Sequence, residues 1–252
     1  MWNNVRQLNL AASALNALLV LALLAAGGYW LVQRPNFTLR EIRIEGDTDH
    51  INSPTVRASV VGHLKGNFFT VDLDQARQAF EQMPWVRHAS VRRVWPNVLA
   101  VTLEEYQPLG TWGSDQLVSV DGELFTANQD EVETKLPAFD GPDGTAKEVV
   151  ARYHDFQKWF APIGAKPAEV TLSPRYAWTV KLSNGTQVEL GRERNADTLG
   201  DRSRRLTAAW SAVTQRWGND IEYADLRYPN GFAIRAAGMR FISDPNQDPG
   251  KK

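Results

Sequence analysis

Hydrophobic residues follow two different patterns along this chain, and the first is a single apolar run near the N-terminus. Residues 8–32 read LNLAASALNALLVLALLAAGGYWLV, and no charged residue lies between Arg6 and Arg34. As a helix with a rise of about 1.5 Å per residue, residues 10–32 extend roughly 34 Å, enough to cross a hydrocarbon core of about 30 Å. The run therefore predicts a transmembrane helix over residues 10–32.

A cleaved signal peptide is the main alternative for this run, because Ala25-Ala26-Gly27 offers small residues to a peptidase. The apolar run continues past them to Val32, however, and Arg6 alone makes a thin basic region. Tyr29 and Trp30 stand where an interfacial aromatic belt would fall. We therefore expect an uncleaved anchor. The short end, residues 1–9, would stay inside the cell, and the long C-terminal part would be translocated across the membrane.

After the anchor, polar and apolar positions alternate with the periods of strands and amphipathic helices. The expected elements are a strand over 37–45, a helix starting at Ser53-Pro54, a helix starting at Asp72, and strands over 86–94 and 99–103. Asp72 and Gln75 resemble a capping box, and apolar residues follow them at helical spacing. The turn Trp95-Pro96-Asn97 separates the last two strands. This order predicts a small α+β module over residues 37–106, with two helices on one face of a three-stranded sheet.

Residues 107–242 alternate between hairpins and helical patterns. Turns at Asp121-Gly122 and Asn184-Gly185 predict hairpins, and residues 130–144 read as a Pro/Gly-rich loop. Helical spacing is found over 149–160 and 199–217, and the last strands are expected at 221–226 and 232–236. The pattern predicts a β-rich domain with one extended antiparallel sheet and helices on one face. Residues 243–252 are polar and are expected to be a disordered tail.

Composition and charge exclude several function classes. A net charge of −1 argues against nucleic acid as the main partner. With no cysteine, the chain has no disulfide framework, thiol nucleophile or cysteine metal site, which suits an oxidising compartment.

The sequence shows no recognisable catalytic set. The histidines His50, His63, His88 and His154 are scattered without metal-ligand spacing, and no G-x-S-x-G elbow occurs. Glu104 and Glu105 are adjacent on a strand and point to opposite faces. The arginines Arg202, Arg204 and Arg205 read as a solvated helix face. We expect a protein without enzymatic activity, cofactor, metal or small-molecule substrate.

Binding through a sheet edge is the remaining hypothesis. A final strand over 232–236, followed by a polar tail, would leave unpaired backbone groups that invite another strand. Phe232 and Ile234 would lie on one face of this strand, and Gly231 would permit close backbone approach. Tyr228, next to Pro229, would provide a hydrophobic anchor.

The string VRHASVRRVWPNVLAVTLEEYQPLGTW (86–112), placed after a single span, resembles a POTRA domain, in particular that of the FtsQ/DivIB family of bacterial cell-division proteins. Four later strings are also similar to that family: LVSVDGELF (117–125), LPAFDGP (136–142), LSNGTQVELGR (182–192) and YADLRYPNGFAIR (223–235). The resemblance covers nearly the whole chain.

The resemblance implies an inner-membrane scaffold of the division septum, in which the POTRA domain serves recruitment. The β domain of the family receives FtsB, which itself pairs with FtsL. The matching positions here are Arg227, Tyr228, Asn230, Gly231 and Phe232, with Arg192 as a further candidate.

Two other function classes stay open at this stage. A transport or assembly factor also fits a POTRA domain, although such proteins continue into many barrel strands of about ten residues. A membrane-tethered hydrolase or sensor would need convergent polar residues in a pocket.

Overall fold

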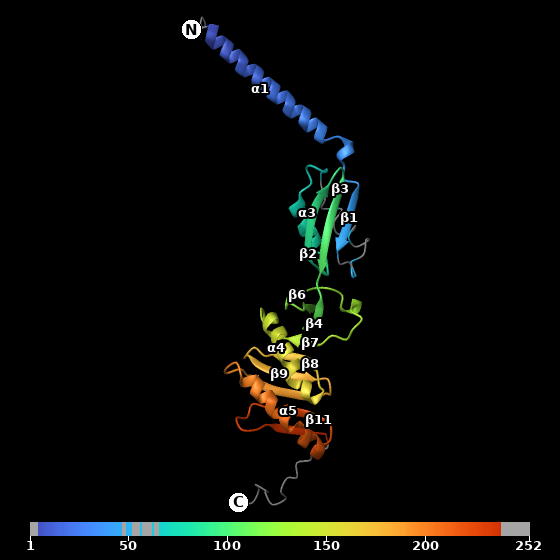
Figure 1. The fold of residues 1–252 in the computed structure, drawn as a ribbon, viewed down its shortest axis with the longest axis vertical. Coiled ribbons are helices and arrows are strands. Elements are labelled where there is room, and N and C mark those ends of the chain that lie inside the picture. The colour runs from blue at the N-terminus through green and yellow to red at the C-terminus, as the bar shows by residue number, and fades with distance from the viewer. Residues whose placement is uncertain (1–4, 47–48, 52–55, 57–61, 63–65, 238–252) are drawn as a thin grey trace, which may run out of the picture. The chain divides into compact units, whose positions relative to one another are not determined.

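The computed structural model describes residues 5–46, 49–51, 56, 62 and 66–237 (Figure 1). The chain divides into two compact units, residues 1–106 and 107–252. The helix expected from Ser53 and the tail expected over 243–252 fall largely or wholly outside the described residues.

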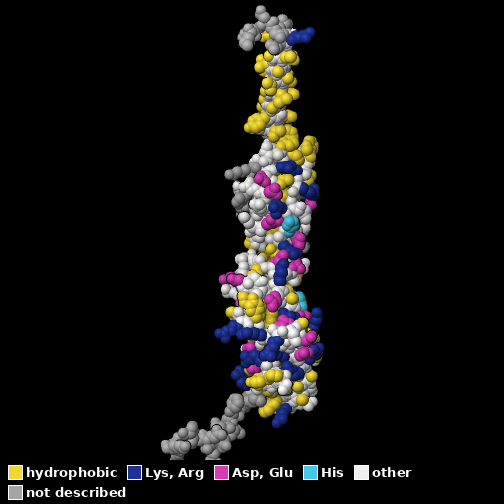
Figure 2. All heavy atoms as spheres, turned by 90° about the vertical axis from the view of Figure 1, so that its left-hand side faces the viewer, with side chains coloured by type: hydrophobic (Ala, Val, Ile, Leu, Met, Phe, Trp, Pro, Cys, Tyr) yellow, Lys and Arg dark blue, Asp and Glu magenta, His cyan; other side chains and the backbone are white. Residues whose placement is uncertain are grey.

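The first element is the helix α1 (Val5–Val32), which contains the predicted span. Its large hydrophobic side chains are exposed, for example Leu24 at 71 % and Leu10 at 70 %. Figure 2 shows hydrophobic side chains covering the helix surface. Among the described helices it alone is long and apolar enough to cross a membrane. A helix with apolar residues on every face, whose large apolar side chains are exposed, is consistent with a single-pass membrane anchor.

The rest of the first unit is built on a three-stranded sheet. After the short 3₁₀ helix η1 (Pro35–Phe37), the strands are β1 (Glu41–Gly46), β2 (Val86–Val94) and β3 (Val98–Glu105), in the order β1-β3-β2. β1 runs parallel to β3, and β2 runs antiparallel to it. The first strand thus begins four residues later than the pattern over 37–45 predicted, because Pro35 and Phe37 form a turn of 3₁₀ helix.

One described helix, α3 (Leu73–Glu81), packs on this sheet. Asp72 caps it as expected, since its carboxylate accepts from the backbone N–H groups of Asp74 and Gln75. Phe80 is fully buried against Leu99 and Val101 in the core of the unit. The capped helix and its apolar stripe are therefore what the sequence predicted.

The second unit contains a nine-stranded sheet in the order β12-β11-β10-β9-β8-β7-β4-β5-β6. Its strands are β4 (Pro108–Trp112), β5 (Gln116–Ser119), β6 (Leu124–Phe125), β7 (Ala138–Asp140), β8 (Pro167–Leu172), β9 (Ala177–Leu182), β10 (Gln187–Arg192), β11 (Ile221–Asp225) and β12 (Ala233–Ala236). The short 3₁₀ helices η2 (Gln129–Glu131) and η3 (Ala161–Ile163) lie in the connections.

The prediction that this sheet is antiparallel throughout was wrong. The pairs β7–β8, β10–β11 and β4–β7 are parallel. The first two follow from connectivity, because a helix joins the strands of each pair and a crossover returns the chain in the same direction. The tight turns of the hairpins, by contrast, force antiparallel pairs such as β9–β10.

The strand β7 was also missed, because residues 130–144 read as a loop. It has three residues, with Pro137 before it and the glycine- and proline-rich residues 141–144 after it. Phe139 at its centre is 2 % exposed, and the strand pairs with β4 on one side and β8 on the other. Such a short strand has too few residues to show a period, and its neighbours in the sheet stabilise it.

Two helices cover one face of this sheet, as predicted (Figure 1). They are α4 (Ala146–Phe160) and α5 (Thr198–Trp217), which contact each other as well as the strands. Phe156, Phe160, Leu199 and Leu206 are fully buried. The apolar stripe predicted along α5 is not buried over its whole length, because Trp217 is 42 % exposed.

The other face of the sheet is polar. Lys181 of β9 forms an ion pair with Glu169 of β8 at 2.7 Å, and the Thr179 hydroxyl donates to Glu189 of β10 at 3.1 Å. Along β9, Thr179 and Lys181 alternate with the buried residues Val180 and Leu182. The sheet thus buries one face under helices and solvates the other, as its period-two pattern indicated.

Candidate partner-binding site

Six of the predicted binding residues lie together at one edge of the large sheet. Five of them, Arg227, Tyr228, Asn230, Gly231 and Phe232, belong to the connection between β11 and β12, and Ile234 lies in β12 itself. The structure thus brings together the residues expected from the C-terminal string of the sequence.

The strand β12 forms this edge. It pairs with β11 alone among the described strands, with Asp225 opposite Ala233 and Tyr223 opposite Arg235. An edge strand turns half of its N–H and C=O groups away from its neighbour, where a strand from another chain can pair with them. A partner strand added here would extend the sheet beyond β12.

Phe232 and Ile234 hold the edge strand on the core. Both are partly buried and pack against the hydrophobic cluster beneath the sheet. Ile234 lies opposite Ala224, which is fully buried. Because residues two apart in a strand share a face, one side of this segment is fixed to the domain. Tyr228 differs, since it is 54 % exposed on the connection before β12.

Arg205 of α5 fixes the turn that leads into the edge strand. Its Nη1 donates to the carbonyl oxygens of Tyr228 at 3.1 Å, Pro229 at 2.6 Å and Gly231 at 3.4 Å. A guanidinium satisfies several acceptors from one rigid group. Arg205 therefore acts as a positioning residue for the turn and for the start of β12.

Replacement of Arg205 by methionine is expected to loosen this turn while leaving the rest of the domain folded. The aliphatic stem stays, but the donors to three carbonyl groups are lost, at a cost of about 1–2 kcal/mol. Amide hydrogen exchange should accelerate over residues 226–236. Arg205→Lys, which keeps one charged donor, should show a smaller change. Unaltered exchange in the methionine variant would contradict the positioning role.

Arg227 lies in an ion pair with Asp225. Its Nε and Nη2 donate to the two carboxylate oxygens at 2.9 Å and 2.6 Å, and Asp225 also accepts from the Arg227 backbone N–H at 3.0 Å. The hydrogen bonds from Arg227 lower the pKa of Asp225 below its ordinary value, although burial of the carboxylate acts in the opposite direction. The pair fixes the chain as it leaves β11.

The contribution of the Arg227–Asp225 ion pair to the free energy of unfolding is expected to depend on pH. Because the folded pKa of Asp225 lies below the unfolded value of about 3.9, its contribution is complete above that pH and is lost as the pH falls toward the folded pKa. Asp225→Asn should cost about 1–2 kcal/mol of unfolding free energy at neutral pH. The difference from the parent should shrink in urea titrations below about pH 4. A difference that is constant down to the lowest pH would contradict this assignment.

Arg192 lies two strands away from the edge, at the end of β10, where it pairs with Ala177. The neighbouring Gly191 has a φ of +72°, and a Cβ there would lie 2.8 Å from Cγ of Arg227. Only glycine suits both this left-handed backbone and this close approach. The end of β10 is thus packed against Arg227, which links Arg192 to the edge cluster.

A second arginine of α5, Arg202, fixes this end of β10. It is 8 % exposed and donates from Nη1 to the carbonyl oxygens of Leu190 at 2.5 Å and Arg192 at 3.0 Å. Burial lowers the pKa of Arg202, and the nearby charges of Arg194 and Arg205 act in the same direction. No described carboxylate forms an ion pair with Arg202, and the buried cation is tolerated because carbonyl groups accept its hydrogen bonds.

The expectation that Arg202, Arg204 and Arg205 form a solvated face was therefore wrong for two of the three. Arg204 is exposed and pairs with Asp201 one turn earlier. Arg202 and Arg205 instead point to strand ends and to the β11–β12 turn. The one signal available in the sequence was the spacing of Arg202, which shares a helix face with Leu199 and Leu206. All three are buried in the structure.

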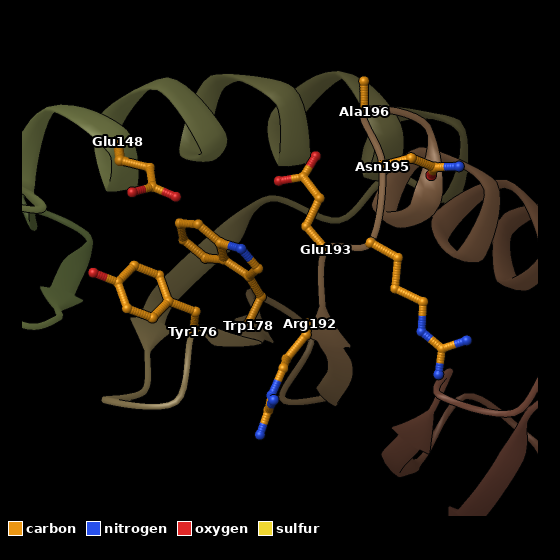
Figure 3. A pocket seen from close by; sticks show the side chains of 8 residues that line it. Glu148, Tyr176, Trp178, Arg192, Glu193, Asn195 and Ala196 are labelled. Carbon is orange, nitrogen blue, oxygen red and sulfur yellow. The ribbon is translucent and has the colours of Figure 1, made fainter.

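A hollow of about 420 Å³ lies beside Arg192, lined also by Glu148, Tyr176, Trp178 and Glu193 (Figure 3). In Figure 3 the side chains of Arg192 and Glu193 point in opposite directions. Glu193 accepts from Nη2 of Arg152 at 2.7 Å, which joins this segment to α4. Arg192 is exposed and is directed away from α4, where its charge is available to an acidic partner group.

The described residues contain no group of three or more His, Asp or Glu side chains with the proximity needed to hold a metal ion. His50 contacts Glu105 at 2.9 Å and His88 contacts Glu81 at 3.1 Å, both within the first unit. His154 contacts Gln157 in the second unit, and His63 falls outside the described residues. The described histidines therefore each contact a different side chain.

Comparison with known proteins gives matches over most of the chain. Residues 37–106 match the family described as "POTRA domain, FtsQ-type". Residues 110–227 match the family described as "Cell division protein FtsQ/DivIB, C-terminal". The two matched ranges fall in the first and second unit, respectively.

Full-length relatives agree with these matches. The chain is 82 % identical, over the whole of both chains, to a protein of Burkholderia pseudomallei named "Cell division protein FtsQ". It is 45 % identical to a protein of the same name from Bordetella pertussis, again over the whole of both chains. A third such protein, from Neisseria gonorrhoeae, is 30 % identical over 94 % of this chain and 96 % of its own length.

Proposed function

The chain belongs to the FtsQ/DivIB family of cell-division proteins, and from this premise we propose that it is a non-enzymatic scaffold of the division machinery. It binds FtsB, and through FtsB also FtsL, by accepting a strand of the partner at β12. The observation that carries this proposal is the position of β12 at the edge of the large sheet, with no described strand on its outer side.

Three features of the second unit support strand addition at this edge. The core side of the strand is fixed by Phe232 and Ile234, so its backbone is held in place before a partner arrives. The turn before it is held by Arg205. Preorganisation of this kind reduces the ordering cost of binding. Tyr228, exposed beside the strand, supplies an aromatic anchor of the type enriched at binding hot spots.

The proposal assigns a place to each part of the chain. Residues 1–9 are cytoplasmic, residues 10–32 span the inner membrane, and the rest lies in the periplasm at the septum. Residues 37–106 form the POTRA domain, which serves recruitment, and residues 107–242 form the β domain, which binds the partners. The long apolar helix and the absence of cysteine support this arrangement.

The backbone of the partner provides the sharpest test. Synthetic peptides tiling the periplasmic part of FtsB are first screened against the full-length protein in detergent micelles. In the peptide that binds, single N-methyl groups are then introduced at successive positions. Strand addition predicts that alternate N-methyl groups abolish binding, since only every second N–H faces β12. Equal tolerance at all positions would show that side chains alone hold the peptide.

The scaffold role itself is tested in cells. Depletion of the protein should stop septation and give filaments, with FtsB lost from mid-cell. Normal septation in depleted cells would overturn the scaffold role.

A substitution at Gly231 separates binding from folding. A Cβ at this position would meet no described atom within 4 Å, and its φ is not in the left-handed region. Gly231→Leu should therefore leave the free energy of unfolding unchanged within about 0.5 kcal/mol. Capture of FtsB should fall, because the new side chain occupies the space that a partner backbone would enter. Normal capture at normal stability would place the partner elsewhere.

A further inference from the structure

Two loops of the first unit carry large apolar side chains that are open to solvent. Trp95, in the turn between β2 and β3, is 73 % exposed, and Phe69, in the loop before α3, is 47 % exposed. Exposed apolar side chains that gather on one part of a surface mark a contact surface, so the positions of the two loops decide what these rings can do.

The loop that carries Phe69 is hydrogen-bonded to the end of α1. Asn67 Nδ2 donates to the carbonyl oxygen of Val32, the last residue of the helix, at 2.7 Å. The backbone N–H of Phe68 donates to the carbonyl oxygen of Phe37 at 2.9 Å, and the rings of Phe37 and Phe69 meet edge to face at 5.0 Å. Asn67 Oδ1 also accepts from the Phe69 N–H, which fixes the loop tip. Phe69 is thereby held beside the end of the apolar helix.

The turn that carries Trp95 lies at the same end of the unit as the loop of Phe69. The N–H of Arg40 donates to the carbonyl oxygen of Asn97 at 3.1 Å, and Glu41, where β1 begins, is in register with Val98. Arg93 Nη2 donates to the carbonyl oxygen of Val71 at 2.7 Å, which joins this hairpin to the loop of Phe69. Trp95 is therefore placed at the end of the sheet that the chain enters directly from α1.

Charged groups complete the surface. The Arg34 guanidinium stacks over the Trp30 ring, 3.6 Å from its centroid, immediately after the apolar run. Arg40 is exposed six residues later. Aromatic rings with arginines beside them are the composition of a membrane–water interface, where indole and phenyl rings sit at the headgroup level.

We propose that the tips carrying Phe69 and Trp95 insert into the interfacial layer of the bilayer that α1 spans. The occupant is a lipid surface rather than a protein, because the loop of Phe69 is hydrogen-bonded to the last residue of the helix and so continues its apolar surface. This inference rests on the membrane-spanning role of α1 under the proposed function. Together with α1, the two tips give the POTRA domain three contacts with the membrane, which restricts its rotation about the helix.

The absence of cysteine allows a direct test on the full-length protein. Single variants Phe69→Cys and Trp95→Cys are labelled with the fluorophore NBD and reconstituted in vesicles of phosphatidylethanolamine and phosphatidylglycerol. Lipids brominated near the headgroup end of the acyl chains serve as quenchers for positions 69 and 95, and lipids brominated near the methyl end of the acyl chains serve as the quencher for position 22. Ala22→Cys, within the apolar run, reports on the span, and Thr102→Cys, exposed on β3 beyond the hairpin tip, is the control in water.

The expected result is quenching at positions 69 and 95 at least about twofold stronger than at position 102, with strong quenching at position 22. In the Phe69→Cys background, Trp95→Ser should lower the quenching, whereas Trp95→Phe should retain it. If position 22 is quenched but positions 69 and 95 behave like 102, the interfacial contact is wrong while the span stands. If position 22 is not quenched, the proposed anchor itself fails. Shielding of position 95 only after FtsB is added would overturn the lipid assignment in favour of a protein surface.

Discussion

Tyr228→Glu is expected to weaken the capture of FtsB by the full-length protein at least tenfold. The tyrosine is 54 % exposed on the connection to β12, and its carbonyl oxygen, rather than its ring, is the group held by Arg205. Among the described residues, the hydrogen bonds of Arg205 to this turn go to main-chain carbonyl groups and not to the tyrosine ring. Loss of an aromatic anchor at the centre of an interface costs about 2 kcal/mol or more, and a glutamate adds a charge that the interface must desolvate.

The matched control for this prediction is Val120→Glu. Val120 is 42 % exposed beside β5, toward the opposite edge of the sheet from β12. The same change from an apolar to an acidic side chain should leave capture within about twofold of the parent. Both variants should keep the parent's unfolding midpoint in urea. Equal loss of capture in both would show a general effect of charge, and undiminished capture by Tyr228→Glu would remove the edge assignment.

Phe156→Ala should produce the largest loss of stability. Phe156 is fully buried between α4 and the sheet, with the rings of Trp159 at 5.6 Å and Trp178 at 5.8 Å in edge-to-face contact. Truncation of a buried phenylalanine removes its burial free energy and leaves a cavity, at a cost of about 3–5 kcal/mol. The unfolding transition of the second unit should therefore move down by roughly 10 °C or more.

Trp217→Ala provides the comparison for this loss. Trp217 is also an aromatic residue on a helix of the second unit, but it is 42 % exposed at the end of α5. Its replacement should cost about 1 kcal/mol or less, measured by the same urea titration of near-ultraviolet circular dichroism. If the two variants lost equal stability, the core assigned to the space between α4 and the sheet would be wrong.

The predictions for Tyr228→Glu and Phe156→Ala concern two separate parts of the second unit, the edge of the sheet and its hydrophobic core. The helices cover one face of the large sheet and provide its stability through residues such as Phe156. The outer main-chain groups of the edge strand β12 face no other described strand, and groups in this position can be solvated or can pair with an added strand. Arg205 connects the two parts, since it lies on α5 and donates to the turn before β12. The conformation of the turn before the edge strand therefore depends on the helix layer through this contact.

Much of the fold could be predicted where the local pattern is long or strongly signalled. The strand over 86–94 was predicted with its observed bounds, and Asp72 was identified as the cap of α3 because Gln75 follows it at capping-box spacing. The two helices of the second unit also follow from their apolar spacing. These elements form where local preference and burial agree.

The candidate site was predictable in part. The string that contains Tyr228 to Ile234 could be placed at the last strand, since it stands at the end of the patterned region. The roles of Arg202 and Arg205 could not, because their acceptors are carbonyl groups far away in the sequence. Such hydrogen bonds leave no period and no motif in the chain.

The sequence alone determined that an apolar helix of membrane-spanning length precedes two folded units, and that the last strand of the second unit ends its patterned region. Those features depend on hydrophobicity and local backbone preference, which neighbouring residues decide. Only the tertiary structure decided the parallel pairs of the large sheet, the three-residue strand β7 and the placement of Arg205 on the turn before β12. The physical reason is that strand direction and side-chain partners across the fold are set by packing and hydrogen bonds between residues distant in the chain.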